Sequence, residues 1–299
     1  MTKDDANRLE AGLTTTTSAT ATPATTGTRT RSKRWRMRAD GALGVALLAF
    51  MLIAAIIGPM LWRLDPLVSH LPDAFLPPSF AHPCGTDQLG RDQLARILWG
   101  TRLSLMVVLG AGFVAATMGS LLGIIAGYFG GVIDAVLMRL IDIQLAIPFI
   151  LLILLVIAIV GASVGNLILV LGITGWAVYA RVARAKTMEV RELEYIEAAN
   201  VMGLSRIRII FRHVLPNIAT PLWIVLTLDL PRLIVLEASV GFLGLGIQPP
   251  TPTLGNLIGD GRSFILVSQW LVFYPGVAVA ILVVGFNLLG DALARRSTN

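Results

Sequence analysis

The sequence has little charge and almost no cysteine, and both shortages limit what the protein can be. Of its 299 residues, 14% are charged and 55% are hydrophobic, a balance that excludes an ordinary soluble domain. The single cysteine, Cys84, excludes an intrachain disulfide framework. No Gly-x-x-x-x-Gly-Lys-Ser/Thr segment occurs, so the chain lacks the phosphate-binding loop of P-loop ATPases. The composition therefore indicates an all-α membrane protein with several spans.

Six apolar stretches approach the length that is needed to cross about 30 Å of hydrocarbon. They lie at 42–61, 103–128, 145–160, 167–182, 221–241 and 271–289. The third stretch is short, and a start near Val136 would lengthen it. Pro148 lies inside it and predicts a kink. Six spans would place both ends of the chain on the same side of the membrane.

Lysine and arginine are concentrated in three parts of the chain. These are the polar tail at 1–40, where 29–38 read RTRSKRWRMR, the segment between the fourth and fifth stretches, and the C-terminal tail at 292–299. Such segments stay in the cytoplasm, so we expect both termini and the middle segment to be cytoplasmic. Residues 14–28 are almost all Thr, Ala, Gly, Ser and Pro, and we expect the tail to be disordered. Because the basic cluster adjoins a membrane helix, it favours contact with lipid and predicts no nucleic-acid partner.

The segment at 183–217 has the pattern of two short amphipathic helices. Gly203 is a typical helix C-cap and Ser205 a typical N-cap, and Pro216 is predicted to end the second helix. Each helix has side chains at i, i+3, i+4 and i+7 that share one face, namely Tyr195, Ala198, Ala199 and Met202 in the first, and Ile207, Ile210, Phe211 and Val214 in the second. On spacing alone, this pair of helices could lie on the lipid surface or offer an apolar face to another protein.

The residues of this segment carry a more specific signal. Glu197-Ala198-Ala199, followed by Gly203 and then by Leu215-Pro216, resembles the EAA loop of ABC importer permeases. The HVLPN run at 213–217 is similar to the dipeptide, oligopeptide and nickel branch, of the second-permease type, although the wider family usually has Ile where His213 stands. The resemblance implies a coupling helix that docks on a separate ATPase subunit. The coupling residues would be Glu197, Ala198, Ala199, Gly203, Leu215 and Pro216.

The resemblance to the peptide branch extends along most of the chain. It includes GTDQLGRD at 85–92, EASVGFLGLG at 237–246, YPG at 274–276 and FNLLGD at 286–291. It implies the type I ABC importer permease fold, with a first helix and extracytoplasmic loop at 41–100 and a transmembrane domain at 101–291. It also implies a multi-pass protein of the cell membrane, without a cofactor, that carries peptides or related small solutes. The implied partners are a homologous second permease, two ATP-binding subunits and an extracytoplasmic substrate-binding protein.

Charged residues inside or beside the spans are the other candidates for function. Asp229 and Arg232 are i, i+3 neighbours in the fifth stretch, and they could form a structural pair or lie on the substrate path. Arg139 and Asp142 have the same spacing and are predicted to pair at the start of the third span. Intramembrane carboxylates could also serve an ion-gradient-driven transporter or channel, which is the alternative function.

Two further chemical interpretations are weak. Asp87, Arg91, Asp92 and Arg96 place opposite charges at helical spacing on the outer side, but no histidine pairing or cofactor signal makes them catalytic. His82 and Cys84 are only two ligands, which do not make a metal site. The chain has no His-Glu-x-x-His and no Ser with a paired His, so we expect neither an enzyme nor catalytic residues.

Overall fold

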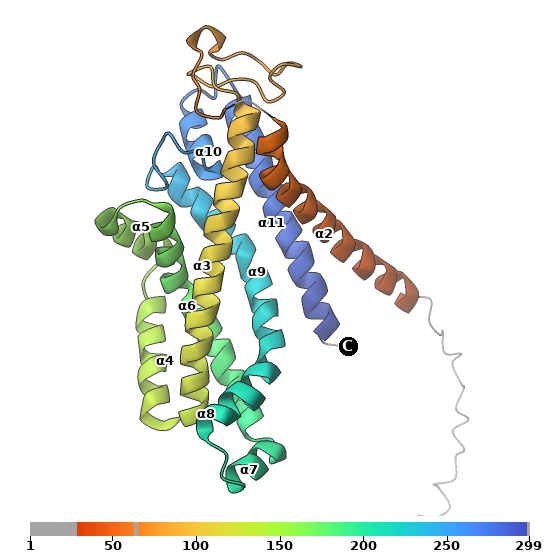
Figure 1. Ribbon diagram of the computed structural model, residues 1–299, viewed down its shortest axis with the longest axis vertical. Coiled ribbons are helices and arrows are strands. Elements are labelled where there is room, and N and C mark those ends of the chain that lie inside the picture. The colour runs from red at the N-terminus through yellow and green to blue at the C-terminus, as the bar shows by residue number, and fades with distance from the viewer. Residues whose placement is uncertain (1–28, 63–64, 298–299) are drawn as a thin grey trace, which may run out of the picture. The chain divides into compact units, whose positions relative to one another are not determined.

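The computed structural model describes residues 29–62 and 65–297, and the predicted disorder at 14–28 lies outside the described residues. The chain divides into two compact units, 1–36 and 37–299, and the arrangement below is that of the second unit. Its described part is helical (Figure 1). The long helices are α2 (Arg29–Leu61), α3 (Gln93–Phe129), α6 (Val164–Arg191), α9 (Leu215–Phe242) and α11 (Trp270–Ser297). The shorter ones are α4 (Gly131–Leu145), α5 (Phe149–Val160), α7 (Glu194–Val201), α8 (Arg206–Ile209) and α10 (Leu254–Arg262), with a 3₁₀ turn at Leu71–Asp73 and a π-helical turn at Ile210–Val214.

The predicted spans correspond to these helices. Within residues 29–62 and 65–297, five helices are long and apolar enough to cross a membrane, and α4 with α5 makes a sixth if this bent pair is one span. The helices extend beyond the predicted apolar limits, because polar residues with good helix propensity continue them into the flanking segments. For the same reason α2 begins at Arg29, inside the segment that was assigned to the tail.

The third span is broken as well as kinked. Helices α4 and α5 meet at an angle of 88° around residues 146–148. Pro148 has no N–H to donate and drives Ile147 away from the helical region, so α4 ends and α5 begins with Pro148 as its N-cap. The kink that was predicted from Pro148 is therefore confirmed, and the two halves point in different directions.

Glycine residues bring α3 and α6 together. Gly119, Gly123 and Gly127 follow one another every four residues, so they form a stripe along α3. A Cβ atom on Gly123 would lie 2.3 Å from the backbone oxygen of Ala180 in α6, and one on Gly119 would lie 2.3 Å from that of Trp176. Such distances are accessible only to glycine, which lets two membrane helices pack backbone against backbone.

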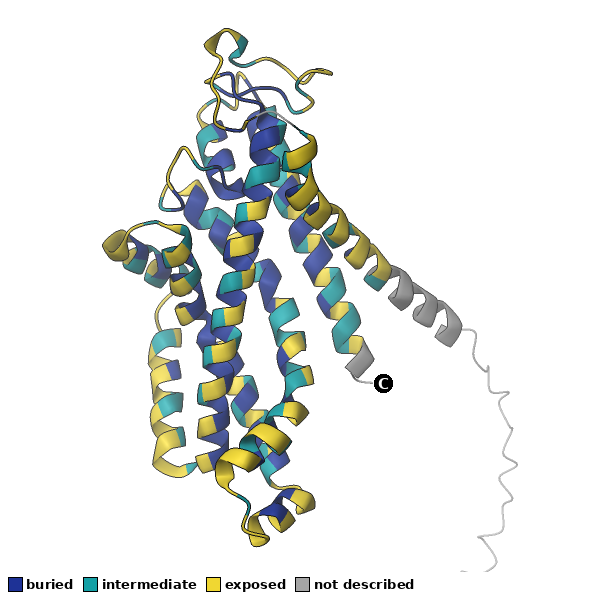
Figure 2. Ribbon diagram, in the orientation of Figure 1, coloured by how far each residue is buried: buried dark blue, intermediate teal, exposed yellow. Residues whose placement is uncertain are grey.

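The interior contains several apolar clusters, one of which fixes the α7–α8 segment. In that cluster Ile196, Ala199, Ile209 and Val214 pack with Ile124 of α3 and Ala183 of α6. Figure 2 shows that burial is concentrated in α3, α6 and the upper part of α9, whereas α4 and α7 are largely exposed. The segment at 65–92 and α10 lie at one end of the helices, and α7 and α8 lie at the other end (Figure 1).

Candidate functional site

The α7–α8 segment has the predicted form at its glycine. Helix α7 ends at Val201, and Gly203 follows with a φ of +76°. The Leu204 N–H donates to the Ala199 carbonyl over 3.2 Å and the Gly203 N–H to that of Asn200 over 3.0 Å, which is the Schellman arrangement at a helix C-terminus. Ser205 is the N-cap of α8, as predicted, although its side chain makes no capping hydrogen bond.

The second helix does not end at Pro216, so that prediction is wrong. Helix α8 passes through a π-helical turn at Ile210–Val214 and continues as α9, with Pro216 in the first turn of α9. A proline is tolerated there because the wider π turn that precedes it accommodates the ring. The segment that was predicted to stop before the fifth span is thus continuous with it.

The predicted coupling residues divide into an outward and an inward group. Glu197, Ala198, Gly203 and Pro216 are exposed, whereas Ala199 is 3% exposed and packs inward, and Leu215 is half-buried against the same cluster. The predicted common face of Ala198 and Ala199 is therefore split by the packing. Exposed apolar side chains add to the outward group, among them Val201, Met202, Ile207 and Phe211. An apolar surface of this kind is typical of a contact with another protein.

Two arginines contact the end of α3, namely Arg191, the last residue of α6, and Arg206, the first residue of α8. Arg191 Nη1 donates to the Tyr128 carbonyl over 3.1 Å and to the Gly127 carbonyl over 3.3 Å. These carbonyls belong to the last turn of α3, which has no helical donors, so a cation there also meets the negative end of the helix dipole. The guanidinium of Arg206 lies 5.9 Å from the Phe129 ring. The end of α3 is thus in contact with both α6 and α8.

A second candidate site lies at membrane depth. Arg232 Nε donates to Asp229 Oδ1 over 2.6 Å, so the predicted pair is confirmed. The Tyr179 hydroxyl donates to Asp229 Oδ2 over 3.1 Å, and the Arg232 guanidinium lies 4.7 Å from the Phe149 ring. The pair thus joins α9 to α6 and to the first residue of α5. Tyr179 and Phe149 were not predicted, because cross-helix neighbours leave no spacing signal within one helix.

The predicted pairing of Arg139 with Asp142 is wrong. Asp142 accepts instead from Arg181 Nη2 of α6 over 2.7 Å. Arg184, one turn further along α6, donates from Nη2 to Asp134 Oδ2 over 2.6 Å. Because α4 packs beside α6, bonds between the two helices replace the predicted i, i+3 bond within α4.

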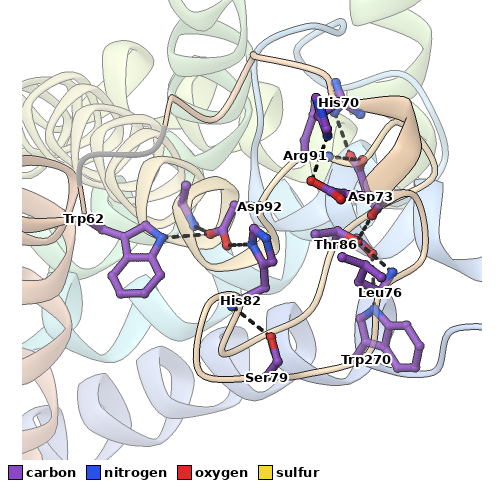
Figure 3. Close-up of polar contacts among 12 residues, drawn as sticks. Trp62, His70, Asp73, Leu76, Ser79, His82, Thr86, Arg91, Asp92 and Trp270 are labelled. Carbon is purple, nitrogen blue, oxygen red and sulfur yellow. Dashed lines mark hydrogen bonds and ion pairs between the residues drawn. The ribbon is translucent and has the colours of Figure 1, made fainter.

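The charged residues near the start of α3 form a structural network (Figure 3). Asp87 is buried and accepts from Arg91 Nε over 2.7 Å and from Arg96 Nη1. Asp92 caps α3 by accepting from the Ala95 N–H over 2.7 Å, and it also accepts from Trp62 Nε1 over 3.0 Å. Each carboxylate has several donors, so the network holds the 65–92 segment on the helices. Residues 88–89 form a turn before α3, and the i, i+4 charges of Asp87 and Arg91 pair across it.

The contacts of His82 and Cys84 are not those of a metal site. His82 Nδ1 is 2.9 Å from Asp92 Oδ2, and the part of the chain that the structure describes has no group of three or more His, Cys, Asp or Glu able to hold a metal ion. Burial, and then the nearby Asp92 carboxylate, raise the pKa of the Cys84 thiol from 9.0 to about 11. Both causes disfavour the thiolate.

We therefore expect Cys84 to react slowly with maleimides. At pH 8 the raised pKa lowers the thiolate fraction about a hundredfold relative to a thiol of pKa 9.0, and only the thiolate attacks. The labelling rate should rise with pH up to about 11, and denaturation in detergent should restore fast labelling. The measurement is the pseudo-first-order labelling rate of the folded protein. A rate at pH 8 equal to that of a short cysteine peptide would contradict this account of the outer segment.

Comparison with known proteins identifies the family. Residues 119–298 match the model of the binding-protein-dependent transport system inner membrane component. The dipeptide transport system permease of Alkalihalophilus pseudofirmus is 41% identical over 66% of this chain and 65% of its own length. A probable D,D-dipeptide transport system permease of Escherichia coli is 35% identical over 83% of each chain. The dipeptide transport system permease of Bacillus subtilis is 34% identical over 87% of this chain and 82% of its own length.

A solved structure agrees with these relatives. The chain is similar to a chain of the MetNI methionine ABC transporter in an inward-facing conformation, with a TM-score of 0.53 and 25% identity over 67% of this chain and 95% of that one. The fold is therefore that of a type I ABC importer permease, and its apolar helices fit a multi-pass protein of the cell membrane. The chain belongs to the family of binding-protein-dependent transport system inner membrane components.

Proposed function

We propose that this chain is the permease subunit of an ATP-driven importer of peptides or related small solutes. The observation that carries the proposal is the α7–α8 segment, a helix pair with an exposed apolar surface whose buried side packs against α3 and α6. The segment carries Glu197, Ala198 and Gly203 on its exposed side. The names of the relatives, which include dipeptide permeases, support peptides as the substrate class.

The partners follow from the same family membership. This chain has no phosphate-binding loop of its own, so separate subunits must bind the ATP. The family description also indicates a binding protein. We propose two ATP-binding subunits, a homologous second permease and an extracytoplasmic binding protein. The excess of Lys and Arg at 183–217 and in the tails supports placing α7 and α8 and both termini in the cytoplasm, and residues 65–92 and α10 outside. We also propose a tail at 1–40, a first helix with its outer loop at 41–100, a transmembrane domain at 101–291 and a C-terminal tail at 292–299.

We propose that the face of α9 around Arg232 lines the pathway shared with the second permease. The Arg232 side chain is 40% exposed, whereas that of its partner Asp229 is 9% exposed. A guanidinium that is partly open at membrane depth is too costly beside hydrocarbon, so its open side faces water or protein. The Asp229 carboxylate then has a structural role and the Arg232 guanidinium has an open side toward the pathway.

The α7–α8 surface is tested by a matched pair of substitutions. Ala198→Trp places a large side chain on the exposed side and should weaken ATPase docking about tenfold to a hundredfold, because overpacking an interface costs about 1–3 kcal/mol. Ala199→Trp places the same side chain in the buried cluster and should instead reduce the amount of folded permease. The measurements are the permease level in membranes and ATPase recovery by affinity purification.

Gly203→Val is a third variant for the same surface. Because Gly203 has a φ of +76°, a β-branched residue strains the turn without meeting any neighbour. It should lower coupled transport while the permease remains in the membrane. Normal ATPase recovery and normal transport in both Ala198→Trp and Gly203→Val would refute the coupling role.

A further inference from the structure

A cavity of about 170 Å³ lies at the outer end of α9, and no part of the proposed function accounts for it. It is bounded by the last turn of α9, the turn that follows, and α10. Phe242, Leu243, Gln248, Asp260 and Arg262 are among its lining residues. A volume of this size accommodates one amino-acid residue rather than a whole oligopeptide.

The lining offers acceptors for a positively charged group. The Asp260 side chain is 37% exposed and forms an ion pair with Arg96 Nη2 at 3.7 Å, a distance too long for a hydrogen bond, so its oxygens can still accept one. Gln248 Nε2 uses its hydrogens on the Gly244 and Gly246 carbonyls, at 3.2 and 2.9 Å, which leaves Oε1 to accept. The C-terminus of α9 adds the negative end of a helix dipole.

The same lining offers donors for a carbonyl. The Arg262 guanidinium lies 5.1 Å from the Phe242 ring, so the ring holds it at the cavity while its N–H groups stay available in the guanidinium plane. A carboxylate and a guanidinium in one small cavity match the first residue of a peptide, which carries an ammonium group and, three bonds further on, a carbonyl oxygen.

The cavity adjoins the face of α9 that carries Arg232, because Phe242 belongs to both. Leu228, Val235 and Phe242 recur every seven residues and are all exposed, so they share one face of the helix. Arg232 lies beside Leu228 and Val235 on that face, at i+4 and i−3. This face cannot lie against hydrocarbon at Arg232. It ends at the cavity, about 15 Å beyond Arg232 along the helix at 1.5 Å per residue.

We propose that this cavity is an entry subsite for the amino-terminal residue of the peptide substrate, with Asp260 and Gln248 Oε1 accepting from the ammonium group and Arg262 donating to the first carbonyl. The inference rests on the proposed function, and it adds to it the requirement for a free amino terminus within the permease itself. It concerns a step after the binding protein has released the peptide.

The direct test is protection of a cysteine in the cavity. Leu243→Cys, in a Cys84→Ser background, is labelled with a small methanethiosulfonate in the assembled transporter in proteoliposomes, without the binding protein. Dialanine at about four times its Kd should slow labelling about fivefold, whereas N-acetyl-dialanine should not. Adding Asp260→Asn should remove the protection. Leu266→Cys, which is exposed at the same end and is not part of the lining, is the control and should show no protection.

A second measurement distinguishes the outcomes. ATP-dependent dialanine uptake should fall about tenfold in Asp260→Asn, should be largely restored in Asp260→Glu, and should be unchanged in Asp73→Asn, whose side chain is similarly exposed at 40%. Equal protection by dialanine and N-acetyl-dialanine would overturn the inference. So would weaker docking of the binding protein on Asp260→Asn, which would make the cavity a protein contact. If the unsubstituted transporter takes up no peptide, the proposed function fails first. If the unsubstituted transporter takes up dialanine and Asp260→Asn takes it up at the same rate, only this inference fails.

Discussion

Gly123→Val should almost abolish the folded permease. A Cβ on Gly123 would lie 2.3 Å from the Ala180 oxygen and 2.7 Å from the Ala183 Cβ, so α3 and α6 would have to separate by about 1 Å to reach ordinary contact distances of about 3.5 Å. Such a separation loosens the packing along both helices and costs at least about 1–3 kcal/mol. The amount of folded protein in membranes should fall tenfold or more, measured by fluorescence-detection size-exclusion chromatography in mild detergent.

The control is a glycine in the same pair of helices. Gly165 is the second residue of α6, has no neighbouring atom within 4 Å of its would-be Cβ, and has no positive φ. Gly165→Val should therefore leave the protein level within about twofold of the unsubstituted chain. Similar losses in both variants would mean that any β-branched residue disturbs these helices, and the close approach of α3 to α6 would no longer be the cause.

Asp229→Asn is expected to have the second largest effect. The Asp229 carboxylate accepts from Arg232 Nε over 2.6 Å and from the Tyr179 hydroxyl over 3.1 Å, and its loss leaves a guanidinium unpaired at membrane depth. Hydrogen bonds to a charged group are typically worth about 1.5–3 kcal/mol each, so the permease level should fall steeply. Asp229→Asn with Arg232→Gln removes both charges and should restore much of the protein.

The double variant also separates structure from transport. If Arg232 faces the pathway, the restored protein should still import poorly, because the guanidinium is absent. Tyr179→Phe, which removes one donor and keeps the ring, should have only a modest effect of about 1 kcal/mol. Unchanged protein level and unchanged uptake in Asp229→Asn would contradict both roles of the pair.

The sequence predicts the helices of this fold better than their contacts. Spans are read from long apolar runs, and the break at Pro148 is read from its missing N–H. The 88° angle between α4 and α5 cannot be read from the sequence, because it depends on how α5 packs against α6. Likewise, spacing places Ala198 and Ala199 on neighbouring positions of α7, but only the cluster around Ile196 decides that Ala199 points inward.

The candidate site shows the same limit. Glu197, Gly203 and the Asp229–Arg232 pair are visible in the sequence because they depend on neighbours within one segment. The contacts of Arg191 with the last turn of α3, and of Arg232 with Phe149, join residues far apart in the chain. The same holds for Asp142, whose partner Arg181 lies on another helix. A single sequence gives no signal for such pairs, so the partner residue in each of these contacts is known only from the packing.

The central claim is that this permease works through separate ATPase subunits that dock on α7 and α8. Purification of the tagged permease from its own membranes in mild detergent, followed by reconstitution with its binding protein, tests it most directly. The account predicts that ATPase subunits and a second permease are recovered with it, and that peptide uptake requires ATP and resists a protonophore. Recovery of the permease alone, with uptake that needs no ATP and is stopped by the protonophore, would contradict it.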